Sequence, residues 1–81
     1  MTEVLVRYFA SARAASGVAE ERVVADTLGE ALNELASRHG ARITAILDAS
    51  SLLLNGTRVS DRSTALPDEA ELEVLPPFAG G

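Results

Sequence analysis

The feature that most constrains the fold of this 81-residue chain is one clear amphipathic helix between two groups of strand-like segments. Residues 27–30, Thr-Leu-Gly-Glu, form a capping box, with a hydroxyl three residues before a carboxylate, and predict the start of a helix. The apolar pattern that follows repeats every three or four residues and stops at Gly40, which is typical of a helix end. We expect this helix to cover a sheet with one face, formed by Leu28, Ala31, Leu32, Leu35, Ala36 and His39.

Two strand-like segments precede this helix. Residues 2–9 and 21–25 have the alternation or the β-branched content of strands. Between them, the alanine-rich residues 10–16 stop at Gly17, as a short helix does before a left-handed cap. We expect the two strands to pair antiparallel across this connection.

The second half of the chain predicts three further strands. Asn55-Gly56 separates the apolar segments 52–54 and 57–59, and it predicts a hairpin because both residues of a type I′ turn need positive φ. Residues 71–75 alternate again and are stopped by Pro76. Between the main helix and the hairpin, the apolar side chains predict only a further short helical turn, at Ile43, Ile46 and Leu47.

This order predicts an α+β protein with the β-grasp, or ubiquitin-like, fold. A mixed sheet of about five strands would be covered on one face by one main helix, and its other face would be left to solvent or a partner. The position of the last strand beside the first is an expectation taken from known folds. We expect residues 1–75 to form the domain and residues 76–81 to form an extended carboxy-terminal tail that ends in Gly-Gly.

The tail has a composition suited to entering a narrow cleft. Pro76 and Pro77 each fix φ near −65°, so they predict a stiff spacer. Phe78 then offers an apolar anchor, and Gly80 and Gly81 leave the backbone accessible because they lack Cβ atoms. Six residues beyond the last strand reach roughly 20 Å, which is enough to enter a partner's active site.

Composition narrows the classes of function. The formal net charge of −5 argues against a nucleic-acid surface. The chain has no cysteine and no lysine, which excludes disulfides, thiolate nucleophiles and self-conjugation through lysine side chains. No catalytic set, phosphate loop or metal-ligand cluster is visible, and no signal or membrane-spanning pattern is present. We therefore expect a soluble cytoplasmic protein without catalytic machinery, and no membrane partner.

Both ends of the sequence carry a family resemblance. Tyr8-Phe9-Ala10, Arg13, Gly17 and the terminal segment 75–81 resemble the MoaD/ThiS family of ubiquitin-like sulfur carriers, over essentially the whole chain. Within that family, the Pro-Pro pair and the Phe-Ala-x-x-Arg segment are more similar to the small subunit of molybdopterin synthase (MoaD) than to ThiS or to the carriers used in cysteine synthesis.

The resemblance implies a carrier chemistry at the terminal glycine. A terminal carboxylate has a pKa of about 3.3, so at neutral pH it is ionised and needs activation. In the family, an E1-like (MoeB-like) enzyme uses ATP and Mg²⁺ to adenylate that glycine, and a sulfur donor protein converts it to a thiocarboxylate. The sulfur then passes, in the large MoaE-like subunit, to a cyclic pterin precursor of the molybdenum cofactor. By analogy Gly81 carries the sulfur and Gly80 gives access, while the chain itself binds no cofactor.

The resemblance also implies a docking surface for both partners. It places Phe9, Arg13 and Leu75 on that surface, together with the tail residues Pro76, Pro77, Phe78 and Ala79. An apolar patch with an arginine at its edge is a usual composition for such a surface. The pattern alone leaves open that Phe9 and Leu75 are core residues and that Arg13 is simply solvated.

Three functions stay open at this stage. The first is a sulfur carrier, of the molybdopterin kind or of the ThiS or cysteine-synthesis kind. The second is a ubiquitin-like modifier joined through Gly81 to lysines of other proteins, and the third is an interaction module whose tail is only an anchor. The short tail, the Pro-Pro spacer and the Phe-Ala-x-x-Arg segment occur together and favour the molybdopterin carrier. His39, the only histidine, is interpreted as a helix-end residue and not as a catalytic one.

Overall fold

The structure is a computed structural model that describes residues 2–77. Within those residues no helix is both long enough and apolar enough to cross a membrane. The elements, in chain order, are β1 (Glu3–Tyr8), α1 (Ala10–Ser16), β2 (Glu20–Val24), α2 (Leu28–His39), α3 (Ala41–Ala49), β3 (Ser51–Leu54), β4 (Thr57–Val59) and β5 (Ala70–Leu75).

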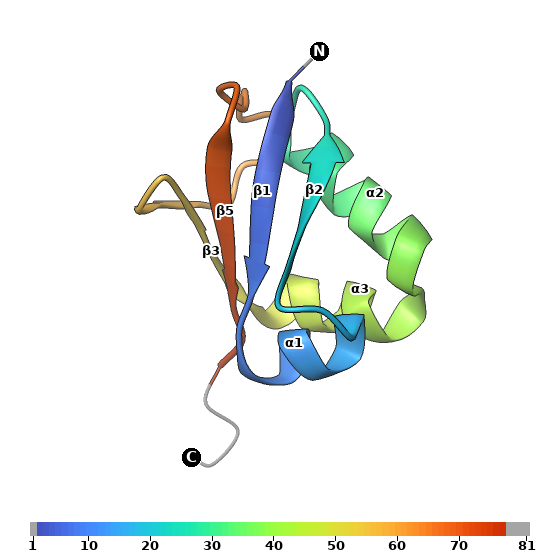
Figure 1. Ribbon diagram of the computed structural model, residues 1–81. Coiled ribbons are helices and arrows are strands. Elements are labelled where there is room, and N and C mark those ends of the chain that lie inside the picture. Colours follow the sequence, from blue (N-terminus) through green and yellow to red (C-terminus); the bar gives the residue numbers. More distant parts are fainter. Residues whose placement is uncertain (1, 78–81) are drawn as a thin grey trace.

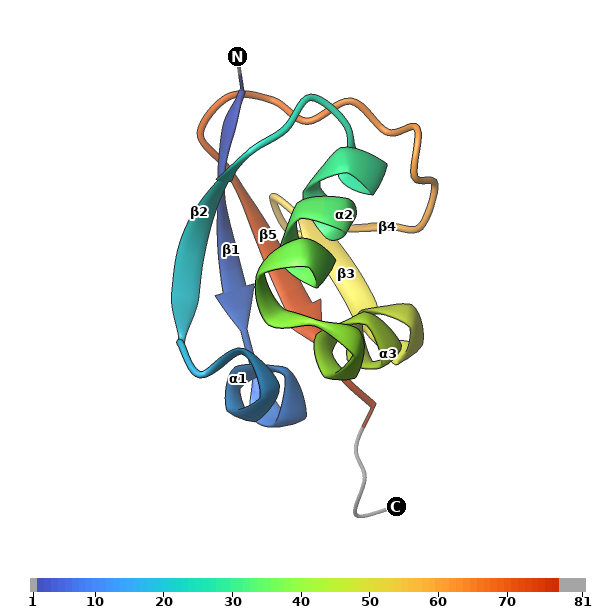
Figure 2. The same cartoon turned by 90° about the vertical axis from the view of Figure 1, so that its right-hand side faces the viewer.

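The five strands form one mixed sheet in the order β2-β1-β5-β3-β4. The first strand pairs antiparallel with β2 and parallel with β5, and the two remaining pairings are antiparallel. The last strand therefore lies beside the first, as the β-grasp prediction required. Figures 1 and 2 show α2 and α3 on one face of this sheet, with α1 at the end of the sheet from which the last strand leaves. We call the opposite, uncovered face the outer face.

The core lies between the inner face of the sheet and the helices. Four residues of the predicted apolar face of α2 are buried, namely Leu28, Ala31, Leu32 and Leu35. The alternate positions of β1 and β5 are also buried, as the alternation predicted. The buried set comprises Val4, Val6, Tyr8, Ala12, Val23, Ala25, Leu28, Ala31, Leu32, Leu35, Ile43, Leu47, Leu52, Leu54, Leu66, Ala70, Leu72 and Val74.

The start of α2 is fixed by its side-chain cap and by a loop. Thr27 Oγ1 accepts a hydrogen bond from the Glu30 backbone N–H at 3.3 Å, and the Glu30 carboxylate accepts one from the Thr27 N–H at 3.2 Å. This reciprocal pair confirms the predicted capping box. The N–H of Gly29 donates to the carbonyl of Arg62 at 2.8 Å. A Cβ at Gly29 would lie 3.1 Å from that oxygen, so glycine permits the close approach of the loop.

The second helical region is longer than its pattern predicted. Residues 41–49 form the helix α3, of nine residues, where a short helical turn was expected. Gly40, with φ of +86°, ends α2 and redirects the chain, and the new helix buries Ile43 and Leu47 one turn apart. Ala41, Ala45 and Ala49 favour helix without contributing to an apolar pattern, so the pattern understates the length.

The predicted hairpin is present with the predicted turn. Asn55 and Gly56 have φ of +49° and +83°, as a type I′ turn requires. The Asn55 side-chain oxygen also accepts a hydrogen bond from the Glu71 N–H at 2.9 Å, and this bond attaches the hairpin to the last strand.

Candidate functional site at the root of the tail

Phe9 and Leu75 lie next to each other although they are far apart in sequence. The parallel register of β1 and β5 ends at the pair Tyr8 and Val74, and the Phe9 N–H donates to the Val74 carbonyl at 3.3 Å. The Phe9 side chain is 40% exposed, and Leu75 is half-buried at the end of β5. Neither residue is part of the buried core, so the structure decides against the alternative that both are core residues.

The outer face of the sheet carries an uncovered apolar patch. Phe9 keeps extended backbone dihedrals, with φ of −125° and ψ of 154°, so it continues the alternation of β1 and points to the same side as Leu5. Leu53 and Leu75 are outward positions of β3 and β5, and they are half-buried like Leu5. We call Leu5, Phe9, Leu53 and Leu75 the outer patch.

Charged residues lie between the members of the outer patch, because Arg7 stands between Leu5 and Phe9 on the outward positions of β1. Arg7 lies 3.3 Å from a carboxylate oxygen of Glu20 and 3.4 Å from one of Glu71. Glu73 is the cross-strand neighbour of both Arg7 and Leu53. These exposed ion pairs contribute little to stability. Glu71 and Glu73 occupy outward positions of β5 and make this part of the outer face acidic, and Glu69 lies in the preceding turn.

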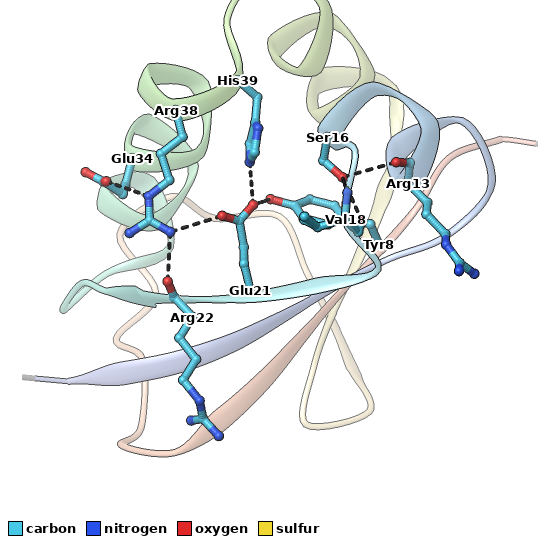
Figure 3. Close-up of polar contacts among 9 residues, drawn as sticks. All are labelled: Tyr8, Arg13, Ser16, Val18, Glu21, Arg22, Glu34, Arg38 and His39. Atoms are coloured by element: carbon cyan, nitrogen blue, oxygen red, sulfur yellow. Dashed lines mark hydrogen bonds and ion pairs between the residues drawn. The ribbon is translucent and has the colours of Figure 1, made fainter.

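The short helix α1 places Arg13 one turn beyond Phe9. The Phe9 carbonyl accepts hydrogen bonds from the N–H groups of Ala12 and Arg13 at 3.1 and 3.4 Å. The helix ends at Gly17, whose φ of +79° and N–H bond to the Arg13 carbonyl form the predicted left-handed cap. Arg13 is exposed, and Figure 3 shows its guanidinium extending away from the helix. It lines a shallow hollow of about 240 Å³ with Arg7, Tyr8, Phe9, Ala10, Ala19 and Glu20.

A polar cluster on the inner face lies directly behind this surface. The Glu21 carboxylate accepts hydrogen bonds from the Tyr8 hydroxyl at 2.6 Å, from Arg38 at 3.1 Å and from His39 Nε2 (Figure 3). The Tyr8 and His39 rings meet edge to face with their centroids 6.1 Å apart. The cluster therefore joins β1, β2 and the end of α2 beside the position where the chain turns into α1.

The cluster shifts the pKa values of its carboxylate and its tyrosine. Burial acts to raise the pKa of the Glu21 carboxyl, but hydrogen bonds donated by Tyr8, His39 and Arg38 outweigh burial and hold that pKa below its ordinary value. Burial, and then the hydrogen bond to the Glu21 carboxylate, raise the pKa of the Tyr8 phenol far above its ordinary value. Glu21 is therefore a carboxylate and Tyr8 a neutral phenol at neutral pH.

Sequence reasoning missed this cluster. It placed Glu21 only at the start of a strand-like segment and interpreted His39 as a helix-end residue. The available signal was alternation, because a strand that turns Val23 inward also turns Glu21 inward. The chain has one tyrosine, Tyr8, on a predicted strand, and one histidine, His39, on the predicted sheet-facing side of the main helix. These two residues supply the hydrogen-bond donors that an inward carboxylate needs.

The described members of the predicted site gather at one end of the sheet. Phe9 and Leu75 lie side by side, and Arg13 is one helical turn away. Pro76 is half-buried and Pro77 is exposed, where the tail leaves the domain. The remaining site residues lie outside the described residues: Phe78, Ala79, Gly80 and Gly81. Within residues 2–77, the structure shows no group of three or more histidine, cysteine, aspartate or glutamate side chains placed to hold a metal ion.

These features define the class of protein. A mixed sheet covered on one face, with its last strand in the middle and followed directly by the terminal segment, is the arrangement of a ubiquitin-like β-grasp protein. The chain belongs to the ThiS family, whose model matches residues 6–81. Its fold is the one shared by the sulfur carriers of the ThiS and MoaD kind, as the resemblance implied.

Solved structures support this assignment. The small archaeal modifier protein 1 of Methanosarcina acetivorans has a TM-score of 0.85 and 27% identity, covering 100% of this chain and 98% of that one. A putative molybdopterin converting factor, subunit 1, from Pyrococcus furiosus has a TM-score of 0.83 and 26% identity, covering 96% and 100%. A complex of subunits 1 and 2 of the molybdopterin-converting factor of Helicobacter pylori 26695 matches at a TM-score of 0.76, 24% identity and coverage of 99% and 100%, which is a likeness of fold alone. A search of curated protein sequences gave no significant match.

Proposed function

We propose that this chain is the sulfur-carrier subunit of a molybdopterin synthase. The observation that carries the proposal is the bond from the Phe9 N–H to the Val74 carbonyl, which places an exposed aromatic side chain at the root of a Gly-Gly tail. A partner that takes the tail into a cleft meets the outer patch at the same time. Docking and delivery of the terminus are thereby one event.

The terminal glycine supplies the chemistry. The carboxylate of Gly81 attacks the α-phosphorus of ATP on an E1-like enzyme, pyrophosphate leaves, and an acyl-adenylate forms. A nucleophilic sulfide equivalent from a sulfur donor then displaces AMP and leaves a terminal thiocarboxylate. Sulfur passes from it to a cyclic pterin precursor in the large subunit. ATP and Mg²⁺ bind to the activating enzyme, and this chain binds no cofactor.

The folded domain serves recognition. The outer patch offers apolar surface without a covering element, and Arg13 at its edge offers an exposed cation for a carboxylate of the partner. The net charge of −5 favours a partner with a basic rim around its cleft. Because the acidic side chains of β5 lie on the outer face, that basic rim would meet the sheet directly.

The comparisons support this proposal and two alternatives. The Pyrococcus furiosus protein is described as a molybdopterin converting factor subunit, and the Helicobacter pylori structure holds two such subunits together, which favours a large-subunit partner. The Methanosarcina acetivorans protein is described as a modifier, and this description favours a second function, conjugation of Gly81 to other proteins. A ThiS-like carrier uses the same terminal chemistry in another pathway.

Intact-mass measurement tests the proposal. The full chain is incubated with an E1-like adenylating enzyme, ATP, Mg²⁺ and a sulfur donor, and then with a large subunit and a cyclic pterin precursor. We expect one terminal oxygen to be replaced by sulfur at Gly81, and that sulfur to be lost when the large subunit and the precursor are added.

One control variant and three alternative outcomes separate the candidate functions. A chain lacking Gly81 should stay unmodified while its melting temperature is unchanged, because the deletion lies outside β5. Sulfur that is retained in the presence of the large subunit would indicate another sulfur pathway. A ladder of heavier conjugates would support the modifier function, and an unmodified chain would contradict both carrier and modifier.

A further inference from the structure

A second apolar surface lies on the helical side of the tail root. It is a groove of about 250 Å³ between α1, α3 and the first residues after β5, lined by Ser11, Ala45, Ile46, Ala49, Pro76 and Pro77. Figure 2 shows α1 and α3 on either side of the point where the last strand leaves the sheet. The walls are almost entirely apolar, with Ser11 as the one polar residue. The groove is distinct from the outer patch, which lies across the sheet.

We propose that this groove receives the side chain of Phe78 when the carrier is free. Pro77 is itself a wall of the groove, and the next Cα follows it at about 3.8 Å, so Phe78 begins at the edge of the groove. The intramolecular link gives the side chain an effective concentration on the order of millimolar or higher without any partner. A second copy or a partner has no such advantage.

The chemistry of the tail matches a single aromatic occupant. Phe78 is the one large apolar side chain among the residues after Pro77, which are otherwise alanine and glycine. A phenylalanine buries about 150–250 Å² when it is enclosed. The exposed alanines Ala45 and Ala49 leave open the space that such a ring would fill. The two prolines limit the directions in which the tail can leave, which reduces the entropy lost on docking.

Docking of Phe78 would hold the last three residues close to the domain. A partner that draws the tail into its cleft would then have to release Phe78 from the groove. The free energy of that release would reduce the partner's affinity for the chain. This inference does not depend on the sulfur chemistry, because it concerns the isolated chain.

Fluorescence of a single introduced indole tests the docking. The chain has no tryptophan, so F78W provides the only indole. Pockets bury roughly 70–90% of a ligand that fits them, so we expect acrylamide quenching of this indole to fall by at least about half relative to the urea-unfolded chain. Its emission should also shift to shorter wavelength.

Groove variants show whether the named surface is the one occupied. Adding A45Q or A49Q to F78W should restore quenching and emission close to the unfolded values, because a polar side chain then fills the groove. A14Q and A41Q are the matched controls, since both alanines are exposed helix residues outside the groove and should change neither value. Equal quenching in folded and unfolded F78W, or protection that A45Q and A49Q leave intact, would overturn the proposal.

Two further measurements test whether the indole enters a second copy and whether the natural phenylalanine docks as the indole does. Protection that rises with protein concentration would mean that the indole enters a second copy, and would overturn the intramolecular site. In the unmodified chain, nuclear Overhauser contacts between the ring protons of Phe78 and the methyl groups of Ile46 or Ala49 should be present, and A49Q should weaken those to Ile46. Their absence would overturn the proposal for the natural side chain.

Discussion

Replacement of Glu21 by alanine should destabilise the domain more than any other single change to an acidic residue of β2. The Tyr8 hydroxyl belongs to a residue that is only 2% exposed and would lose its acceptor, which costs about 1–3 kcal/mol. The half-buried ring of His39 would lose its partner as well, at about 0.5–1.5 kcal/mol. Arg38 is more exposed and keeps its ion pair with Glu34, so the stabilisation lost at Arg38 is small. The free energy of unfolding should therefore fall by about 3 kcal/mol in total.

Thermal and urea unfolding measure this loss. In a domain of this size, about 3 kcal/mol lowers the melting temperature by roughly 12–24 °C. Glu20→Ala is the matched control because it removes the neighbouring carboxylate, which is exposed and, among residues 2–77, forms an ion pair only with Arg7 on the outer face. Glu20→Ala should change stability by less than about 1 kcal/mol. Equal losses for the two variants would refute the reasoning that the Glu21 contacts are the stabilising ones.

The pH dependence gives a second check on Glu21. Because its pKa is lower in the folded state than in the unfolded chain, its carboxylate stabilises the fold above the unfolded pKa. That contribution is lost as the pH falls through the folded pKa. The stability difference between the wild-type chain and Glu21→Ala should therefore be largest at neutral pH and shrink below pH ~4. A difference that stays constant down to strongly acidic pH would contradict an ionic role for Glu21.

Three further changes test other parts of the molecule. Phe9→Glu should weaken binding to the large subunit at least about tenfold while changing stability by less than about 1 kcal/mol. Val24→Glu, at an exposed apolar residue of β2 away from the tail root, should leave binding unchanged; calorimetry and thermal melts measure both. The single tyrosine, Tyr8, should titrate by ultraviolet absorbance at a higher pH in the folded chain than in the urea-unfolded chain, because burial and Glu21 raise its pKa, and a normal titration in the folded chain would contradict the cluster. Thr27→Ala removes the cap of α2 and should cost about 1 kcal/mol in urea unfolding, whereas Thr27→Ser should retain most of the stability.

The parts of the fold that the sequence predicted are those with strong local signals. A capping box, a glycine end and a regular apolar repeat located α2, and Asn55-Gly56 located the hairpin, because each depends on residues that are neighbours in sequence. The helix α3 was underestimated for the same reason. Its alanines stabilise a helix without marking a face, so Ile43, Ile46 and Leu47 were the only apolar signal.

The parts that the sequence left open depend on contacts between distant residues. Pattern alone could not say whether Phe9 is core, because that depends on which sheet face the helices cover. The Glu21 cluster needed the register of β1 against β2 and the position of the end of α2, which bring together residues 13 and 18 positions apart. Those relations follow from packing and not from local propensity.

The direction of one strand pairing explains why a motif near the amino terminus and a tail at the carboxy terminus form one surface. Parallel strands end at the same edge of a sheet, so the parallel pairing of β1 with β5 brings Phe9 beside Leu75. Antiparallel pairing would place the end of β1 at the opposite edge, about 20 Å away along a six-residue strand. Recognition at Phe9 could then not accompany entry of the tail. The crossover of the chain from β1 through the main helix to β5 therefore positions the docking residues at the root of the segment that a partner must reach.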